Sequence, residues 1–111
     1  MSVRELVDKA RMEVLAGELQ PIRVGELASE LSALLGNIFQ EIREADMAFN
    51  AVYAACLDQE GKANRAKIRA ELTPEYQRKR EAHDYHAVTL ELVRSLRKLQ
   101  DSQIGEMRLS R

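Results

Sequence analysis

The sequence predicts an all-α protein, built as a long antiparallel helical hairpin with a short N-terminal helix and a short helical connector. Charged residues make up 32% of the chain and aromatic residues only 5%, with no Trp, five Gly and two Pro. This composition is typical of long helices, because strands favour aromatic residues and turns favour Gly and Pro. Two long segments also repeat apolar residues at intervals of three or four. At 111 residues the chain is expected to form one domain over 1–111.

The N-terminal helix is expected over 3–20. Ser2 can cap it, and Glu5 follows three residues later as in a capping box. Apolar residues recur at helical spacing, and Pro21 is expected to end the helix because the residue before a proline avoids helical geometry.

The first long helix is expected over 24–60, with Gly61 as its C-terminal stop. Its apolar seam advances in steps of three and four, which is a heptad pattern with one irregularity near Ile38. The seam comprises Leu27, Leu31, Leu34, Ile38, Ile42, Ala45, Phe49, Val52 and Cys56.

An alanine-rich connector over 62–72 leads to the second long helix over 74–109. Thr73 suits the cap position and Pro74 the first helical position, where its missing N–H has no cost. Because the connector is short, the two long helices are expected to run antiparallel. The second seam comprises Tyr85, Val88, Leu92, Leu96, Leu99, Gln103 and Met107.

An isolated hairpin buries one apolar stripe but not two, so the second row beside each seam is expected to meet another copy, the N-terminal helix, or both, and a homo-oligomeric bundle is predicted. The residues expected at the interface between copies are Leu35, Phe39, Tyr53, Leu57, Leu90, Val93 and Ile104.

A basic segment over 61–80, "GKANRAKIRAELTPEYQRKR", has two interpretations. Gathered at one end of the hairpin, its cations and one tyrosine could bind nucleic-acid phosphates. The favoured interpretation is a solvated elbow, because the interleaved aromatics of a single-strand binder are too few. The candidate nucleic-acid residues are Lys62, Arg65, Lys67, Arg69, Tyr76, Arg78, Lys79 and Arg80.

No residue pattern predicts catalysis or a cofactor. His83 and His86 share a helix face and could hold two positions on a zinc ion, but a structural zinc needs about four ligands and only Asp46 is expected nearby. Cys56 lies on the apolar seam, which favours a buried structural thiol over a nucleophile. We expect no metal, no cofactor and no enzymatic activity.

The charge distribution is uneven although the net charge is −1. Residues 1–61 hold 11 acidic and 5 basic groups, a balance of −6, and residues 62–111 hold 7 acidic and 12 basic groups, a balance of +5. Such asymmetry suggests halves that face each other, or complementary copies. The single cysteine, the charged N-terminus and the lack of a long apolar run predict a cytoplasmic protein without membrane contact.

The segments "AFNAVYAACLDQEGKANRAKIRAELTPEYQRKREAHDY" and "LVRSLRKLQDSQIGEMRLSR" resemble a group of small helical-hairpin proteins encoded in bacteriophage and prophage genomes. The resemblance covers about three quarters of the chain, and it brings no catalytic or binding residues. It implies a setting in phage DNA replication or recombination, inside the host cytoplasm. The expected function is a non-enzymatic interaction or adaptor protein with an unknown protein partner; the alternatives are direct nucleic-acid binding and virion assembly.

Overall fold

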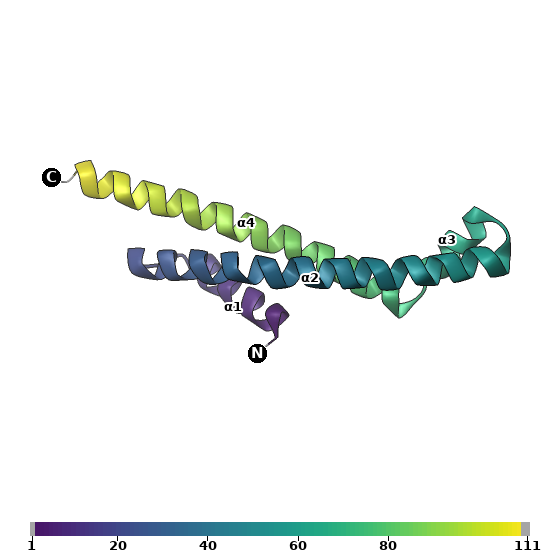
Figure 1. The fold of residues 1–111 in the computed structure, drawn as a ribbon. Coiled ribbons are helices and arrows are strands. Elements are labelled where there is room, and N and C mark those ends of the chain that lie inside the picture. The colour runs from purple at the N-terminus through teal and green to yellow at the C-terminus, as the bar shows by residue number, and fades with distance from the viewer. Residues whose placement is uncertain (1, 110–111) are drawn as a thin grey trace. The chain divides into compact units, whose positions relative to one another are not determined.

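The computed structural model describes residues 2–109 of the chain, with side chains described as far as Glu106, and these residues form helices and no strand. The all-α prediction is confirmed, and the two long helices pack together (Figure 1). The elements are α1 (Val3–Ala16), α2 (Pro21–Glu60), α3 (Ala63–Glu71) and α4 (Pro74–Leu109).

The junction between α1 and α2 lies earlier than expected. Gly17 ends α1 in the left-handed conformation, with φ 79°, and its N–H donates to the Val14 carbonyl at 3.2 Å. Pro21 begins α2 instead of terminating α1, because proline suits the first helical position. The Gln20 carbonyl accepts the first helical hydrogen bond from the Val24 N–H at 3.1 Å.

The other helix ends follow the sequence signals. Ser2 Oγ accepts from the Glu5 N–H at 3.2 Å, as expected for the cap of α1. Gly61 ends α2 with φ 67°. Thr73 Oγ1 accepts from the Tyr76 N–H at 3.4 Å and donates to the Ala70 carbonyl at 2.6 Å, so one hydroxyl links the end of α3 to the start of α4.

The chain forms two compact units, to which α2 and α4 each contribute a part. The bundle unit comprises residues 1–37 and 85–111, and the elbow unit comprises residues 38–84. Both units pair α2 with α4 in antiparallel fashion. In the bundle unit the Gln103 side chain donates to the Leu19 carbonyl at 3.4 Å, and in the elbow unit the Phe49 and Tyr76 ring centroids lie 5.5 Å apart.

The core of the bundle unit joins three helices. The buried face of α4 differs from the narrow predicted seam. Leu92 and Leu96 are buried as expected, but Leu99 of the predicted seam is 38% exposed. Thr89, which is outside that seam, is fully buried. The Met107 side chain lies outside the described residues. The buried residues of this core are Val7, Ala10, Val24, Leu27, Leu31, Thr89, Leu92, Val93 and Leu96.

The elbow unit is built around Cys56. Ala66 and Ala70 of α3 are fully buried and form a cluster with this thiol. The side chains that pack against the cluster are Phe49, Val52, Tyr53 and Leu57. Because alanine has a small side chain, α3 can approach α2 closely at this level.

Candidate interaction surfaces

Two of the candidate nucleic-acid residues, Arg78 and Arg69, form ion pairs inside the elbow unit. Arg78 Nε donates to Glu41 Oε1 at 2.6 Å, and its Nη2 donates to Glu41 Oε2 at 3.1 Å and to Glu44 at 3.4 Å. These hydrogen bonds lower the pKa of Glu41 and raise the pKa of Arg78. Arg69 Nη1 donates to Glu60 at 2.9 Å. Each pair joins the acidic half of the sequence to the basic half, so the charge asymmetry is partly compensated within the chain.

Two further candidates contact the same aromatic ring. The Lys79 ammonium lies 4.6 Å from the centroid of the Phe49 ring, a cation–π distance. The Tyr76 ring is tilted by 49° against Phe49. Tyr76 therefore packs on an aromatic neighbour of its own chain, and a nucleobase would have to compete with that contact.

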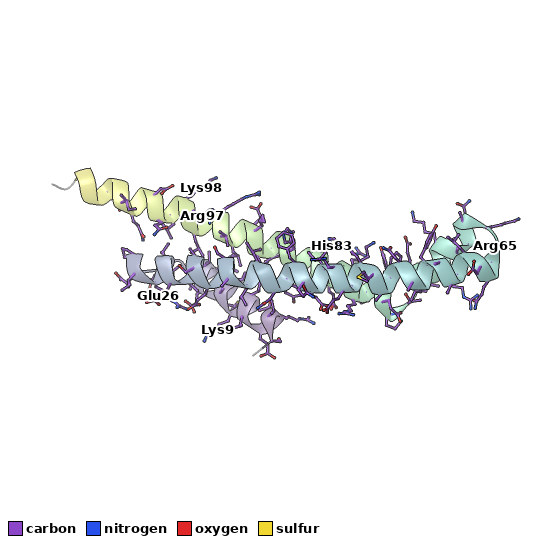
Figure 2. The ribbon with its side chains drawn as sticks, in the orientation of Figure 1. Lys9, Glu26, Arg65, His83, Arg97 and Lys98 are labelled. Carbon is purple, nitrogen blue, oxygen red and sulfur yellow. The ribbon has the colours of Figure 1, made fainter. Side chains whose placement is uncertain are left out.

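The remaining candidates are exposed. Arg65 lies on α3 (Figure 2). Lys67 lies on the same helix, Lys62 precedes it, and Arg80 lies on α4. None of these four cations has an ion pair within the described part of the chain. They are the part of the basic segment that remains available to an outside partner.

The histidines and the cysteine occupy separate surroundings. His83 Nε2 lies 3.0 Å from Asp46 Oδ1, and both side chains are partly exposed. Asp46 is thus the facing carboxylate that the sequence predicts. Cys56 is buried among apolar groups, and no metal-binding group of three or more His, Cys, Asp or Glu residues occurs in the described residues. The Nε2 atom of His86 is buried.

The residues expected between copies are distributed over different environments. Val93 is buried in the bundle core, and Tyr53 and Leu57 pack on the Cys56 cluster. Leu35 and Leu90 are half-buried. Phe39 and Ile104 are 53% and 43% exposed and lie at the surface.

The most exposed large apolar residues were absent from the predicted interface. Met12 and Leu15 of α1 are 69% and 71% exposed; Ile68 of α3 and Leu72, which follows α3, are 64% and 82% exposed. A helical projection of α3 could have found the second pair, since it lies opposite Ala66 and Ala70. Ile22 and Met47 are exposed to a similar degree, at 75% and 72%.

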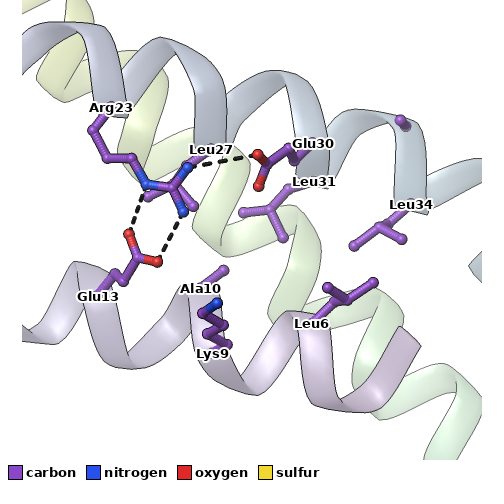
Figure 3. Close-up of a pocket in the computed structure, with 10 residues that line it drawn as sticks. Leu6, Lys9, Ala10, Glu13, Arg23, Leu27, Glu30, Leu31 and Leu34 are labelled. Atoms are coloured by element: carbon purple, nitrogen blue, oxygen red, sulfur yellow. Dashed lines mark hydrogen bonds and ion pairs between the residues drawn. The ribbon is translucent and has the colours of Figure 1, made fainter. Parts of the chain in front are cut away.

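A groove of about 560 Å³ runs between α1 and α2 in the bundle unit (Figure 3). Its apolar lining includes Leu6, Leu31 and Leu34. At one end Arg23 donates two hydrogen bonds of 2.8 Å to Glu13, and it also pairs with Glu30 at 3.5 Å. The hydrogen bonds from Arg23 lower the pKa of Glu13 and raise that of Arg23. This clamp holds α1 on α2, and the groove beside it suits apolar groups.

No described helix is both long enough and apolar enough to cross a lipid bilayer. Comparisons with protein-family models, with curated proteins and with solved structures found no match to this chain. These comparisons therefore assign no family, and the resemblance to phage hairpin proteins stays an expectation from the sequence.

Proposed function

We propose that the protein is a non-enzymatic helical interaction module that assembles with further copies of itself. The observation that supports this most strongly is the pairing of exposed apolar residues at helical spacing. Met12 and Leu15 are three residues apart, and Ile68 and Leu72 are four apart; all four are more than 60% exposed. Single exposed apolar residues are ordinary, whereas rows of them mark contact surfaces.

The surroundings of the reactive side chains agree with a binding role. A nucleophilic thiol needs a nearby base and an electropositive, accessible setting. Cys56 instead lies against Ala66 and Ala70 at 7% exposure. The described polar partner of His83 is Asp46, on the surface of the elbow unit.

For the biological setting, we propose an accessory in phage DNA replication or recombination, with virion assembly as the alternative. This part of the proposal rests on the sequence resemblance. An adaptor that joins other proteins needs outward-facing apolar helical rows, and the chain has two of them.

Direct nucleic-acid binding is the second candidate function. It is favoured by the exposure of Lys62, Arg65, Lys67 and Arg80, which have no ion pair in the described chain. It is disfavoured by the engagement of Arg78, Lys79 and Tyr76 with Glu41 and Phe49. We therefore rank it below the interaction module.

Multi-angle light scattering over a concentration series tests the proposed function. The expected result is a mass of at least two chains at micromolar concentration, with dissociation on dilution. The same samples are examined by circular dichroism, so that aggregation of unfolded chains is distinguished from assembly of helical ones. A folded, strictly monomeric protein over the whole series would overturn the proposal.

A further inference from the structure

The outward face of α1 carries a stripe that is acidic in its first half and apolar in its second. The α1 stripe comprises Glu5, Asp8, Met12 and Leu15, with spacings of three, four and three that place them on one side of the helix. All four residues are exposed, and this side lies away from the buried Val7. Neither carboxylate forms an ion pair within the described residues.

The outward face of α3 carries the complementary stripe, basic first and apolar second. The α3 stripe comprises Arg65 and Ile68 on the helix and the two residues that flank it, the extended N-cap residue Lys62 and the C-cap residue Leu72. All four are exposed, and Ile68 and Leu72 project away from the Ala66–Ala70 side that packs on Cys56. Among the large apolar residues whose side chains the structure describes, Leu72 is the most exposed, at 82%.

The two stripes match in order and in charge when their helices run parallel. Asp8 then faces Arg65 and Glu5 lies toward Lys62, the residue before α3, while the apolar pairs Met12–Ile68 and Leu15–Leu72 meet beyond them. An antiparallel arrangement would place the carboxylates on aliphatic side chains and leave both charges without partners, which disfavours it.

We propose that the α1 stripe of one copy packs in parallel against the α3 stripe of a second copy. This inference rests on the proposed self-assembly and names the surfaces that carry it. Each stripe is left exposed by the described residues of its own unit. Opposite charges at the interface select the partner and the register, and the aliphatic pairs add the apolar contact.

Other ligands would pair with or cover only some of the residues in these two stripes. A phosphate backbone can pair with Lys62 and Arg65 but leaves Ile68 and Leu72 uncovered, and neither can stack on a base as an aromatic ring does. An anionic membrane surface attracts the α3 stripe but repels Glu5 and Asp8. A second copy accounts for both stripes at once.

Each copy carries one stripe of each kind, so the contact is between unlike surfaces. Such contacts either close, with two copies exchanging both stripes, or continue as an open chain of copies. A single helix-to-helix contact over about three turns is small, and a closed pair doubles its area. We therefore expect reversible, concentration-dependent association.

Charge reversal provides the test, with Asp8→Lys and Arg65→Glu made in separate chains. Each variant alone places like charges opposite one another, and its dissociation constant by light scattering should rise about tenfold or more. An equimolar mixture of the two should regain association, because the two reversed positions then face each other with opposite charges. Combining both changes in one chain should restore self-association as well. Both positions are exposed, and circular dichroism checks that the helices persist.

Cysteine pairing tests the direction of the helices. A mixture of Met12→Cys and Ile68→Cys chains, oxidised with glutathione disulfide, should give a linked heterodimer. A mixture of Glu5→Cys and Leu72→Cys chains should not, since those positions meet only in the antiparallel arrangement. Each single variant measures the background from the native, buried Cys56.

The outcomes separate this inference from the proposed function. An assembly that neither charge reversal weakens overturns the pairing of the stripes and leaves self-assembly standing, whereas a monomeric wild type overturns both. Loss of binding to a single-stranded oligonucleotide or to phosphatidylserine vesicles in Arg65→Glu, with the protein mass unchanged, would assign the α3 stripe to those ligands and overturn the inference.

Discussion

Arg78 holds Glu41 through two hydrogen bonds of 2.6 and 3.1 Å, so that α4 and α2 are joined by a forked ion pair within the elbow unit. Both side chains are 44% exposed. The guanidinium favours the charged carboxylate, and the pKa of Glu41 consequently lies below its ordinary value of 4.5. In the bundle unit Arg23 lowers the pKa of Glu13 in the same way.

These pairs predict a loss of stability in acid. Because both glutamates have a lower pKa in the folded chain than in the unfolded chain, the unfolded state takes up protons first as the pH falls. Their contribution is complete above about pH 5 and disappears as the pH drops through the folded-state pKa. The Tm of the wild type should therefore fall below about pH 5, and that of Arg23→Gln/Arg78→Gln should fall less. If the curves of Tm against pH for the wild type and the double variant were parallel at one fixed protein concentration, the two ion pairs would not be the source of the acid sensitivity.

A substitution at Thr89 is expected to stabilise the folded chain. Its side chain is fully buried in the bundle core, and its Oγ1 has no hydrogen-bond partner among the described residues. Replacing Thr89 by Val removes an unsatisfied hydroxyl and keeps the branched shape, which should raise the free energy of unfolding by about 1 kcal/mol. Thr89→Ser keeps the hydroxyl and removes the methyl group, and should lower it by about 1 kcal/mol. Urea denaturation measures both, and a destabilised Val variant would refute the prediction.

The burial of Ala66 indicates that α3 approaches α2 closely, which a larger side chain at this position would prevent. The residue is fully buried against Cys56, so Ala66→Leu overfills the cluster and should cost about 1–3 kcal/mol. The matched control is Lys67→Leu, whose side chain is exposed and whose cost should stay within about 0.5 kcal/mol. Displacement of α3 should also speed reaction of Cys56 with a thiol reagent. Equal stability and equal labelling rates in the two variants would show that α3 does not pack tightly.

The basic segment predicts weak, salt-sensitive nucleic-acid binding at most. Neutralising Lys62, Arg65, Lys67 and Arg80 together should remove binding at low salt, and the salt slope on duplex DNA should shrink by about 0.9 for each phosphate that is no longer neutralised. Neutralising Arg78 should instead act on stability, because it is paired with Glu41. Sub-micromolar binding at physiological salt, abolished by the quadruple change with the helices intact, would promote nucleic-acid binding to the first-ranked function.

Much of the fold was predictable because its signals are local. Ser2, Gly61 and Thr73–Pro74 specify helix ends through their own backbone and side-chain geometry. Pro21 was expected to end the first helix, but proline also suits the first position of a helix. Gly17 had already ended α1, and Pro21 begins α2. The candidate site was only partly predictable: a run of cations in the sequence does not reveal that Arg69 and Arg78 face glutamates.

The sequence by itself determined the helices, because capping and apolar periodicity act over a few neighbouring residues. Tertiary structure alone decided which apolar residues are covered. In the bundle unit Thr89 and Val93 are buried in the core while Leu99 is 38% exposed, so the buried face of α4 differs from the predicted seam. Packing of α3 through Ala66 and Ala70 decided that Ile68 and Leu72 face outward. Both outcomes depend on contacts between residues far apart in the chain, and periodicity within a single helix carries no information about them.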